Sequence, residues 1–157
     1  MNFSDTGLSL LKTLEGFRGK PYPDSGGKMT VGYGHLIVKG DGLSTDNSID
    51  QVKATELLTK DVQNAVTCVN NCVTSTINQN QFDALVIFAY NVGNHALQNS
   101  TLLAKLNAGD IEAATKQFLV WNKVKFKGAF VEVAGLTNRR LAEQKLFNTS
   151  VGVQDGT

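Results

Sequence analysis

The chain has 157 residues, of which 41% are hydrophobic and 18% charged, a composition typical of a globular protein and not of a disordered chain. Its formal net charge of +1 is far below that of most nucleic-acid-binding domains, so we expect no nucleic-acid partner. No apolar run approaches the roughly 18 residues that a membrane span requires. The first residues also lack the pattern of an export signal, so we expect no membrane insertion.

The first 45 residues read as a helix followed by a small antiparallel sheet. Residues 4–14 carry leucines at helical spacing, which predicts a helix that ends near Gly16 or Phe17. Both prolines of the chain follow and exclude further helix. Gly26-Gly27 then indicates a hairpin turn, and residues 29–33 read as a strand.

A single long helix is predicted for residues 49–72, where valines and a leucine recur at roughly helical spacing. Ser48 is the candidate N-cap, because Gln51 follows three residues later in the pattern of a capping box. This helix would connect an N-terminal lobe of about residues 13–60 to a C-terminal lobe of about residues 73–150, which also includes the N-terminal helix.

The rest of the chain is predicted to be mostly helical. The predicted helices and their N-caps are 79–92 after Asn78, 101–108 after Ser100, 111–121 after Asp110, and 138–147 after Thr137. Residues 123–133 alternate polar and apolar side chains, which fits either an irregular β-hairpin or a surface loop. The tail, residues 151–157, is expected to be frayed.

Cys68 and Cys72 are the only cysteines, and both histidines lie far from them in sequence. Two thiols alone do not complete a zinc site, so we predict no metal. A disulfide between residues four apart on a helix requires awkward geometry. We therefore favour two buried free thiols over a bridge.

Two carboxylates flank the proline-containing segment, and a hydroxyl follows it. Cleavage of a glycosidic bond needs one protonated carboxyl for the leaving oxygen and one ionised carboxylate that activates water or attacks the sugar. Glu15, at a helix C-terminus beside apolar residues, is placed to keep its proton. Asp24 lies in a polar turn that favours the ionised form, and Thr30 is placed to hold a water against it. Spacing alone does not establish catalysis, because most acids at such a distance are simply solvated.

The stretch from Glu15 to His35 resembles the active-site region of the phage lysozyme (endolysin) family, the T-even phage lysozyme relatives of glycoside hydrolase family 24. That family has a Glu, eight residues, an Asp, five residues and a Thr, and Glu15, Asp24 and Thr30 match this spacing. The resemblance continues in the same order through residues 79–93, 99–110, 118–121 and 135–147. It implies an α+β, mostly helical lysozyme-like fold. In this fold a small N-terminal lobe with a short antiparallel sheet is joined to a larger helical C-terminal lobe by the long helix.

The resemblance also implies a function. The chain would be an endolysin muramidase that hydrolyses the β-1,4 bond between N-acetylmuramic acid and N-acetylglucosamine with inversion and without a cofactor. Glu15 would be the general acid, and Asp24 with Thr30 would activate the attacking water. We expect a monomer whose partner is the glycan strand of peptidoglycan. It would stay in the host cytoplasm until a membrane lesion lets it reach the cell wall in the periplasm.

Six further positions match family positions, and each also has an ordinary structural reading. Leu36, Tyr90, Asn91 and Ser100 resemble residues that line the cleft or contact sugars. Arg139 resembles an arginine that reaches toward the catalytic Glu, with a helix-surface cation as the alternative. His35 is expected to support the small lobe through a hydrogen bond or ion pair, and not to act as a base.

Three other functions remain open on the sequence alone. A lytic transglycosylase cuts the same bond with a single acid and forms an anhydro sugar, which the presence of Asp24 and Thr30 argues against. A wall-binding module without activity would be favoured by the loss of either acid, but both are present. A preference for chitin is a weaker third alternative. The lysines of residues 123–135 could attract the enzyme to peptidoglycan.

Overall fold

In the computed structural model of the protein, residues 1–152 are described, and they form two compact units. One unit consists of residues 8–63, and the other combines residues 1–7 with residues 64–152. Helices and small antiparallel sheets occur together in this part of the chain, which confirms the predicted α+β class. Most of the tail for which we predicted fraying, residues 153–157, lies outside the described residues.

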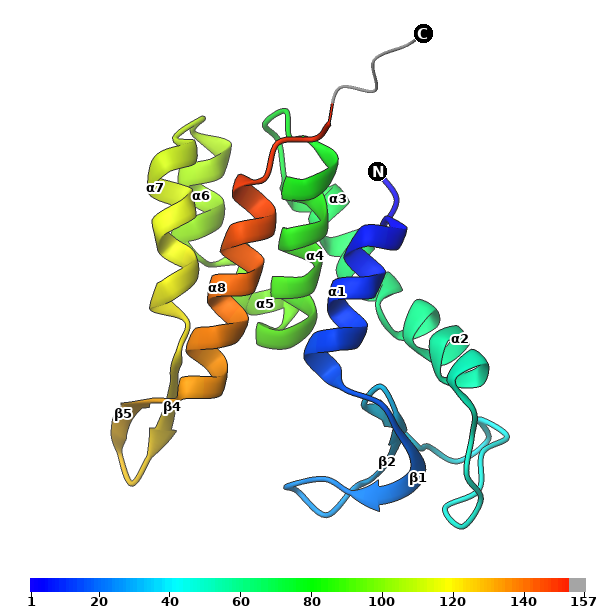
Figure 1. Cartoon of the computed structure of the whole chain (residues 1–157). Coiled ribbons are helices and arrows are strands. Elements are labelled where there is room, and N and C mark those ends of the chain that lie inside the picture. Colours follow the sequence, from blue (N-terminus) through cyan, green and yellow to red (C-terminus); the bar gives the residue numbers. More distant parts are fainter. Residues whose placement is uncertain (153–157) are drawn as a thin grey trace, which may run out of the picture. The chain divides into compact units, whose positions relative to one another are not determined.

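The unit of residues 8–63 is built from the end of one helix, a sheet and a second helix (Figure 1). Its elements are α1 (Asp5–Glu15), β1 (Arg18–Pro23), β2 (Met29–Gly32), β3 (His35–Leu36) and α2 (Gln51–Asp61). The strands form an antiparallel sheet in the order β1-β2-β3. Helix α2 packs against β2 and β3. The apolar side chains of Leu11, Val31 and Leu58 are fully or almost fully buried.

The other unit is mainly helical (Figure 1). Its elements are α3 (Gln63–Cys72), α4 (Gln79–Val92), α5 (Asn94–Gln98), α6 (Thr101–Asn107), α7 (Ile111–Gln117), the short 3-10 helix η1 (Phe118–Val120), β4 (Lys123–Phe126), β5 (Ala129–Glu132) and α8 (Ala134–Asn148). Helix α4 is buried on all sides from Phe82 to Ala89 and packs against α8. Phe88 of this helix meets Phe118 and Trp121 edge to face, which defines the aromatic centre of the unit.

Three predicted helix caps are confirmed. Asn78 accepts a hydrogen bond from the backbone N–H of Gln81, whose side chain accepts one in return from the Asn78 N–H, so α4 begins with a full capping box. Ser100 caps α6 and Asp110 caps α7.

The long helix predicted for residues 49–72 is instead two helices, α2 and α3, with Val62 between them. The apolar stripe continues through Val62, which is buried, so periodicity could not reveal the break. The predicted N-cap at Ser48 is also wrong, because Asp50 caps α2 by accepting from the Lys53 N–H at 2.8 Å. The cause is tertiary: the Ile49 N–H donates to the Gly19 carbonyl at 2.8 Å, which holds residue 49 outside the helix.

The last helix begins earlier than the sequence predicts. Helix α8 starts at Ala134, and Thr137 lies within its first turn, where its hydroxyl oxygen accepts from Asn122 at 3.1 Å instead of capping. The segment read as either hairpin or loop is a hairpin, in which β4 pairs with β5. The helix predicted for residues 111–121 ends at Gln117 and continues only as the 3-10 turn η1.

Candidate active site

Glu15 is the last residue of α1, and the helix stops there because the next residue takes a left-handed conformation. Gly16 has φ +72° and donates its N–H to the Lys12 carbonyl at 2.9 Å. The Glu15 side chain is half-buried and lies beside the turn after β2, where a Cβ added at Gly34 would lie 3.6 Å from Glu15 Oε2. The unsubstituted backbone of Gly34 therefore leaves room around the carboxyl.

The same end of α1 is fixed to the sheet by an aromatic contact. The buried ring of Tyr33 packs against Phe17, with 5.6 Å between the ring centroids. The Lys12 ammonium lies 5.7 Å from the centre of the Tyr33 ring. These contacts from both sides of Glu15 hold the helix end in a defined position against the β2–β3 turn.

Asp24 lies at the start of the β1–β2 turn, and one of its oxygens holds that turn together. Its Oδ1 accepts the backbone N–H groups of Gly26 at 2.9 Å and Lys28 at 2.8 Å. Its Oδ2 has no hydrogen-bond partner among the described residues, and the residue is exposed. The carboxylate is thus fixed by one oxygen and has the other open to an incoming molecule.

Thr30 lies on the neighbouring strand and is 95% buried, since only 5% of it is exposed. Its hydroxyl donates to the Lys28 carbonyl at 3.0 Å, which leaves the oxygen lone pairs available. Tyr22 pairs with Thr30 across β1 and β2, and the Asp24 N–H continues this ladder by donating to Lys28 O at 2.8 Å. Asp24 follows directly after the end of β1, so the alternation of side chains along that strand predicts that Asp24 and Thr30 share a face as diagonal neighbours.

His35 lies between two carboxylates of the same unit. Its Nδ1 is 2.7 Å from Asp61 Oδ2, and its Nε2 is 3.3 Å from Asp41 Oδ2. The backbone N–H groups of Val38 and Leu43, which bond Asp41, lower the pKa of that carboxyl. Both ring nitrogens of His35 are therefore occupied by structural partners. The adjacent Leu36 is partly exposed.

The remaining candidates lie in the other unit. Asn91 Oδ1 accepts from Arg140 Nη2 at 2.6 Å, and Tyr90 beside it is half-buried. Ser100 is 6% exposed, and its hydroxyl caps α6 by donating to Leu97 O and accepting from the Leu103 N–H. Arg139 is buried and donates from Nε to Glu143 at 3.4 Å. Sugar contacts by Tyr90 and Asn91 stay predictions.

A buried ion pair in α8 went unrecognised in the sequence. Arg140 and Glu143 are both inaccessible to solvent, with Arg140 Nε 2.6 Å from Glu143 Oε1 and Nη2 3.0 Å from Oε2. Burial raises the pKa of Glu143 to about 7, while the charges of Arg140 and Arg139 act in the opposite direction. Burial likewise lowers the pKa of Arg140. The spacing of three residues on one helix was the available signal.

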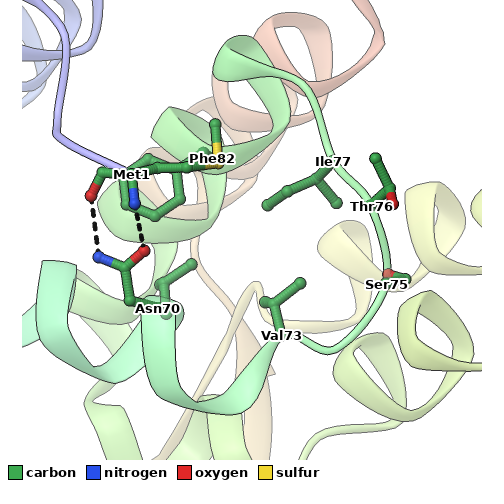
Figure 2. A pocket seen from close by; sticks show the side chains of 8 residues that line it. Met1, Asn70, Val73, Ser75, Thr76, Ile77 and Phe82 are labelled. Carbon is green, nitrogen blue, oxygen red and sulfur yellow. Dashed lines mark hydrogen bonds between the residues drawn. The ribbon is translucent and has the colours of Figure 1, made fainter.

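Two cavities in the mainly helical unit are the alternatives to this site. One, of about 280 Å³, is lined by Asn91, Val92, Trp121, Lys123, Leu136 and Arg140. The other, of about 260 Å³, lies between α3 and α4 and is shown in Figure 2. Its walls are mostly apolar, including Val73, Ile77 and Phe82, and the Met1 backbone closes it through paired hydrogen bonds to Asn70. Neither lining includes a carboxylate, so neither resembles a centre for acid–base chemistry.

The described residues contain no group of three or more His, Cys, Asp or Glu side chains that could hold a metal ion. Cys68 and Cys72 are free thiols. Burial, together with the neighbouring Cys68, raises the pKa of the Cys72 thiol to about 11, which makes it a poor nucleophile near neutral pH. Within residues 1–152 we also find no helix both long and apolar enough to cross a bilayer.

Comparison with known proteins gives a consistent result. The model of the Phage lysozyme family matches residues 12–143. The chain is 37% identical to the endolysin of Acyrthosiphon pisum secondary endosymbiont phage 1, over 96% of this chain and 100% of that protein. It is 44% identical to the endolysin of Bacillus phage B103, but spans only 55% of that protein's length. The solved endolysin of Escherichia coli O157:H7 phage FAHEc1 superimposes with a TM-score of 0.89 at 36% identity, covering 98% of each chain.

Proposed function

Because the chain belongs to the phage lysozyme family, we propose that Glu15, Asp24 and Thr30 form its catalytic centre and that it hydrolyses its substrate with inversion. The family membership makes the chain a muramidase, a glycoside hydrolase that acts on peptidoglycan in the lysis of a host cell. The lysozyme-like fold expected from the sequence is confirmed by the same comparisons.

In the proposed reaction, Glu15 donates its proton to the glycosidic oxygen as the bond to the anomeric carbon breaks. A water bound between the open Oδ2 of Asp24 and the Thr30 hydroxyl attacks that carbon from the opposite face, and Asp24 accepts the proton that the water loses. The product hydroxyl then has the inverted configuration. Exchange with solvent returns a proton to Glu15 and removes the one on Asp24, which completes the cycle.

The observation that supports this assignment is that the two carboxylate oxygens of Asp24 differ in their hydrogen bonds. In a retaining enzyme one oxygen of the carboxylate attacks the sugar, whereas in an inverting enzyme that oxygen binds a water, which a second polar group beside it helps to hold. Asp24 has one oxygen fixed by two backbone N–H groups and the other open, beside Thr30 on the same face of the hairpin. This favours a fixed base over an attacking group.

Around this centre we propose that Leu36 contacts the sugar and that His35 holds the sheet in place through Asp41 and Asp61. The Ser100 hydroxyl caps α6, and its contact with a sugar stays a prediction. The enzyme acts on the cell wall after release. We further propose that it acts as a monomer, needs no cofactor, binds no nucleic acid, and passes from the host cytoplasm through a membrane lesion.

The test is product analysis on purified peptidoglycan. We expect NMR during the first minutes of the reaction to detect the α-anomer at the new reducing end, and mass spectrometry to detect products that have gained one water. Initial β-anomer would contradict inversion. Products that lack the water would identify a transglycosylase instead.

Variants test the residue roles in the same assay. Glu15→Gln and Asp24→Asn should each reduce turnover by about a hundredfold or more while leaving the thermal midpoint nearly unchanged. Exposed acids of the same unit provide matched controls, since Glu56→Gln and Asp46→Asn should retain wild-type turnover. A fully active Glu15→Gln or Asp24→Asn enzyme would remove that residue from the mechanism.

A further inference from the structure

The hairpin formed by β4 and β5 is unusual in that every one of its strand residues is exposed. Phe126 is 60% and Phe130 74% exposed, and Val124 and Val131 are also exposed. Single exposed apolar residues are common, but a continuous group of them on one small element is typical of a contact surface.

The strand register distributes these side chains over both faces. Phe126 pairs with Ala129 and Val124 with Val131, so one face is entirely apolar. Phe130 pairs with Lys125 on the opposite face. The two phenylalanines therefore lie on opposite faces at the tip, on either side of the Lys127-Gly128 turn.

The hairpin is also cationic. It carries Lys123, Lys125 and Lys127 against the single acid Glu132. Among the described residues, neither Lys125 nor Lys127 forms an ion pair, although the Lys127 ammonium lies 5.4 Å from the centre of the Phe126 ring. The positive charge is thus available to an anionic partner.

The base of the hairpin is firmly held, whereas its body is not covered. The Val133 N–H donates to Asn122 O at 2.9 Å, and the buried Asn122 side chain donates to Thr137 on α8 at 3.1 Å. In the described part of the chain, neither strand packs extensively on any element except its partner. Figure 1 shows the hairpin extending past the ends of α7 and α8.

We propose that this hairpin is a contact site for an anionic phospholipid surface. The lysines would bind the headgroups, and the rings of Phe126 and Phe130 would enter the boundary between headgroups and acyl chains. A flat protein or glycan surface would cover one face of the hairpin. Apolar side chains on both faces of the tip favour a medium that surrounds the tip from all sides, as a lipid interface does. The contact is peripheral and needs no spanning segment.

The test measures co-sedimentation of the full chain with vesicles of phosphatidylglycerol mixed with phosphatidylethanolamine, and with vesicles of phosphatidylcholine alone. We expect binding to the anionic vesicles only, and weaker binding as salt is raised. Lys125→Gln with Lys127→Gln, and Phe126→Ser with Phe130→Ser, should each weaken binding about tenfold or more. Val52→Ser and Lys60→Gln remove an exposed valine and an exposed lysine elsewhere and should bind as wild type.

A second measurement looks for a new fluorescence signal, so its positive result cannot come from a variant that fails to fold. Phe130→Trp adds a second tryptophan to the single Trp121, and its fluorescence should shift to the blue and be quenched by brominated lipid in anionic vesicles. Equal binding to both vesicle types, wild-type binding by the hairpin variants, or an unquenched Trp would overturn the proposal. So would a dimer that the Phe variants dissociate, or hairpin-dependent binding to purified peptidoglycan instead of vesicles. Muramidase turnover on purified peptidoglycan should be unaffected, so the two proposals fail separately.

Discussion

At the scale of single residues, the proposed catalytic centre includes a threonine that is almost inaccessible to solvent. Only 5% of Thr30 is exposed, and its hydroxyl hydrogen already points to the Lys28 carbonyl. The Thr30 hydroxyl can therefore only accept a hydrogen bond from a bound water. Because that water directs a hydrogen at Thr30, its lone pairs point away from the threonine. In the proposed mechanism Thr30 would therefore position the attacking water, and Asp24 would accept its proton.

We expect Thr30→Val, which keeps the shape of the side chain but removes the hydroxyl, to lower turnover about a hundredfold. Thr30→Ser keeps the hydroxyl and should retain most of the turnover. Thr30→Val loses the hydroxyl and Thr30→Ser loses the methyl group, both at the same buried position. Thermal midpoints of the two variants, measured in parallel, therefore separate a loss of catalysis from a loss of stability. Equal turnover by Val and wild type would show that water is held by other groups.

A second prediction at this scale concerns Glu143. Burial of its carboxyl raises its pKa from 4.5 to about 7. The folded state then holds this proton more tightly than the unfolded state. The resulting stabilisation is complete below pH 4.5 and is lost as the pH rises through 7. The free energy of unfolding of the wild type, relative to Glu143→Gln, should fall by about 1.4 kcal/mol per pH unit across this window.

Denaturant unfolding of both proteins at pH 4.5, 5.5, 6.5 and 7.5 measures this difference. Glu143→Gln is the suitable reference because it keeps the size and one acceptor oxygen but does not titrate. If the wild type instead becomes more stable relative to Glu143→Gln as the pH rises, the charges of Arg140 and Arg139 outweigh burial and keep Glu143 ionised.

At the scale of elements, the packing of α2 on the sheet depends on a glycine. Gly32 ends β2 with φ +71°, and a Cβ there would lie 3.0 Å from Ala54 Cβ and 3.2 Å from Ile49 Cδ1. A side chain would therefore meet two costs, one from the left-handed backbone and one from displacing α2.

We expect Gly32→Ala to lower the free energy of unfolding by about 2–4 kcal/mol, measured by urea denaturation. Gly42→Ala is the control, because Gly42 has φ +76° but nothing within 4 Å of the added Cβ. It should cost only the backbone contribution of about 1–2 kcal/mol. If the two variants are equally stable, the close approach to α2 contributes nothing.

The elements also show which structural features can be predicted from sequence. Caps decided by local hydrogen bonds, at Asn78, Ser100 and Asp110, were predicted correctly. The starts of α2 and α8 were not, because they are set by contacts with distant residues. Ile49 bonds Gly19, and Val133 bonds Asn122, and no pattern near either helix start encodes these partners.

The candidate site likewise has features that the sequence predicts and features that it does not. The spacing of Glu15, Asp24 and Thr30 could be read from the sequence because all three lie within residues 15–30 of one unit. The free Oδ2 of Asp24 and the double role of Ser100 as donor and acceptor required coordinates. Arg140 and Glu143 were missed because an arginine and a glutamate three residues apart usually form an exposed pair, and only burial distinguishes this one.

At the scale of the whole molecule, the near balance of 15 basic and 14 acidic residues limits long-range attraction to an anionic wall. Electrostatic steering depends on the summed field, which is weak at a net charge of +1, whereas a local cationic element acts only within about a Debye length of 8–10 Å. Catalysis on the wall and binding to lipid should therefore respond differently to salt.

We expect hydrolysis of purified peptidoglycan to change less than about threefold between 50 and 200 mM NaCl, because net charge contributes little to that encounter. Binding to anionic vesicles, measured in the same buffers, should fall much more steeply, because three lysines of one hairpin supply the attraction. The variant with Lys125→Gln and Lys127→Gln is the internal control and should show a flatter salt response with vesicles only. A hydrolysis rate that drops tenfold with salt, and loses that dependence in this variant, would instead place the anionic partner of the hairpin in the wall.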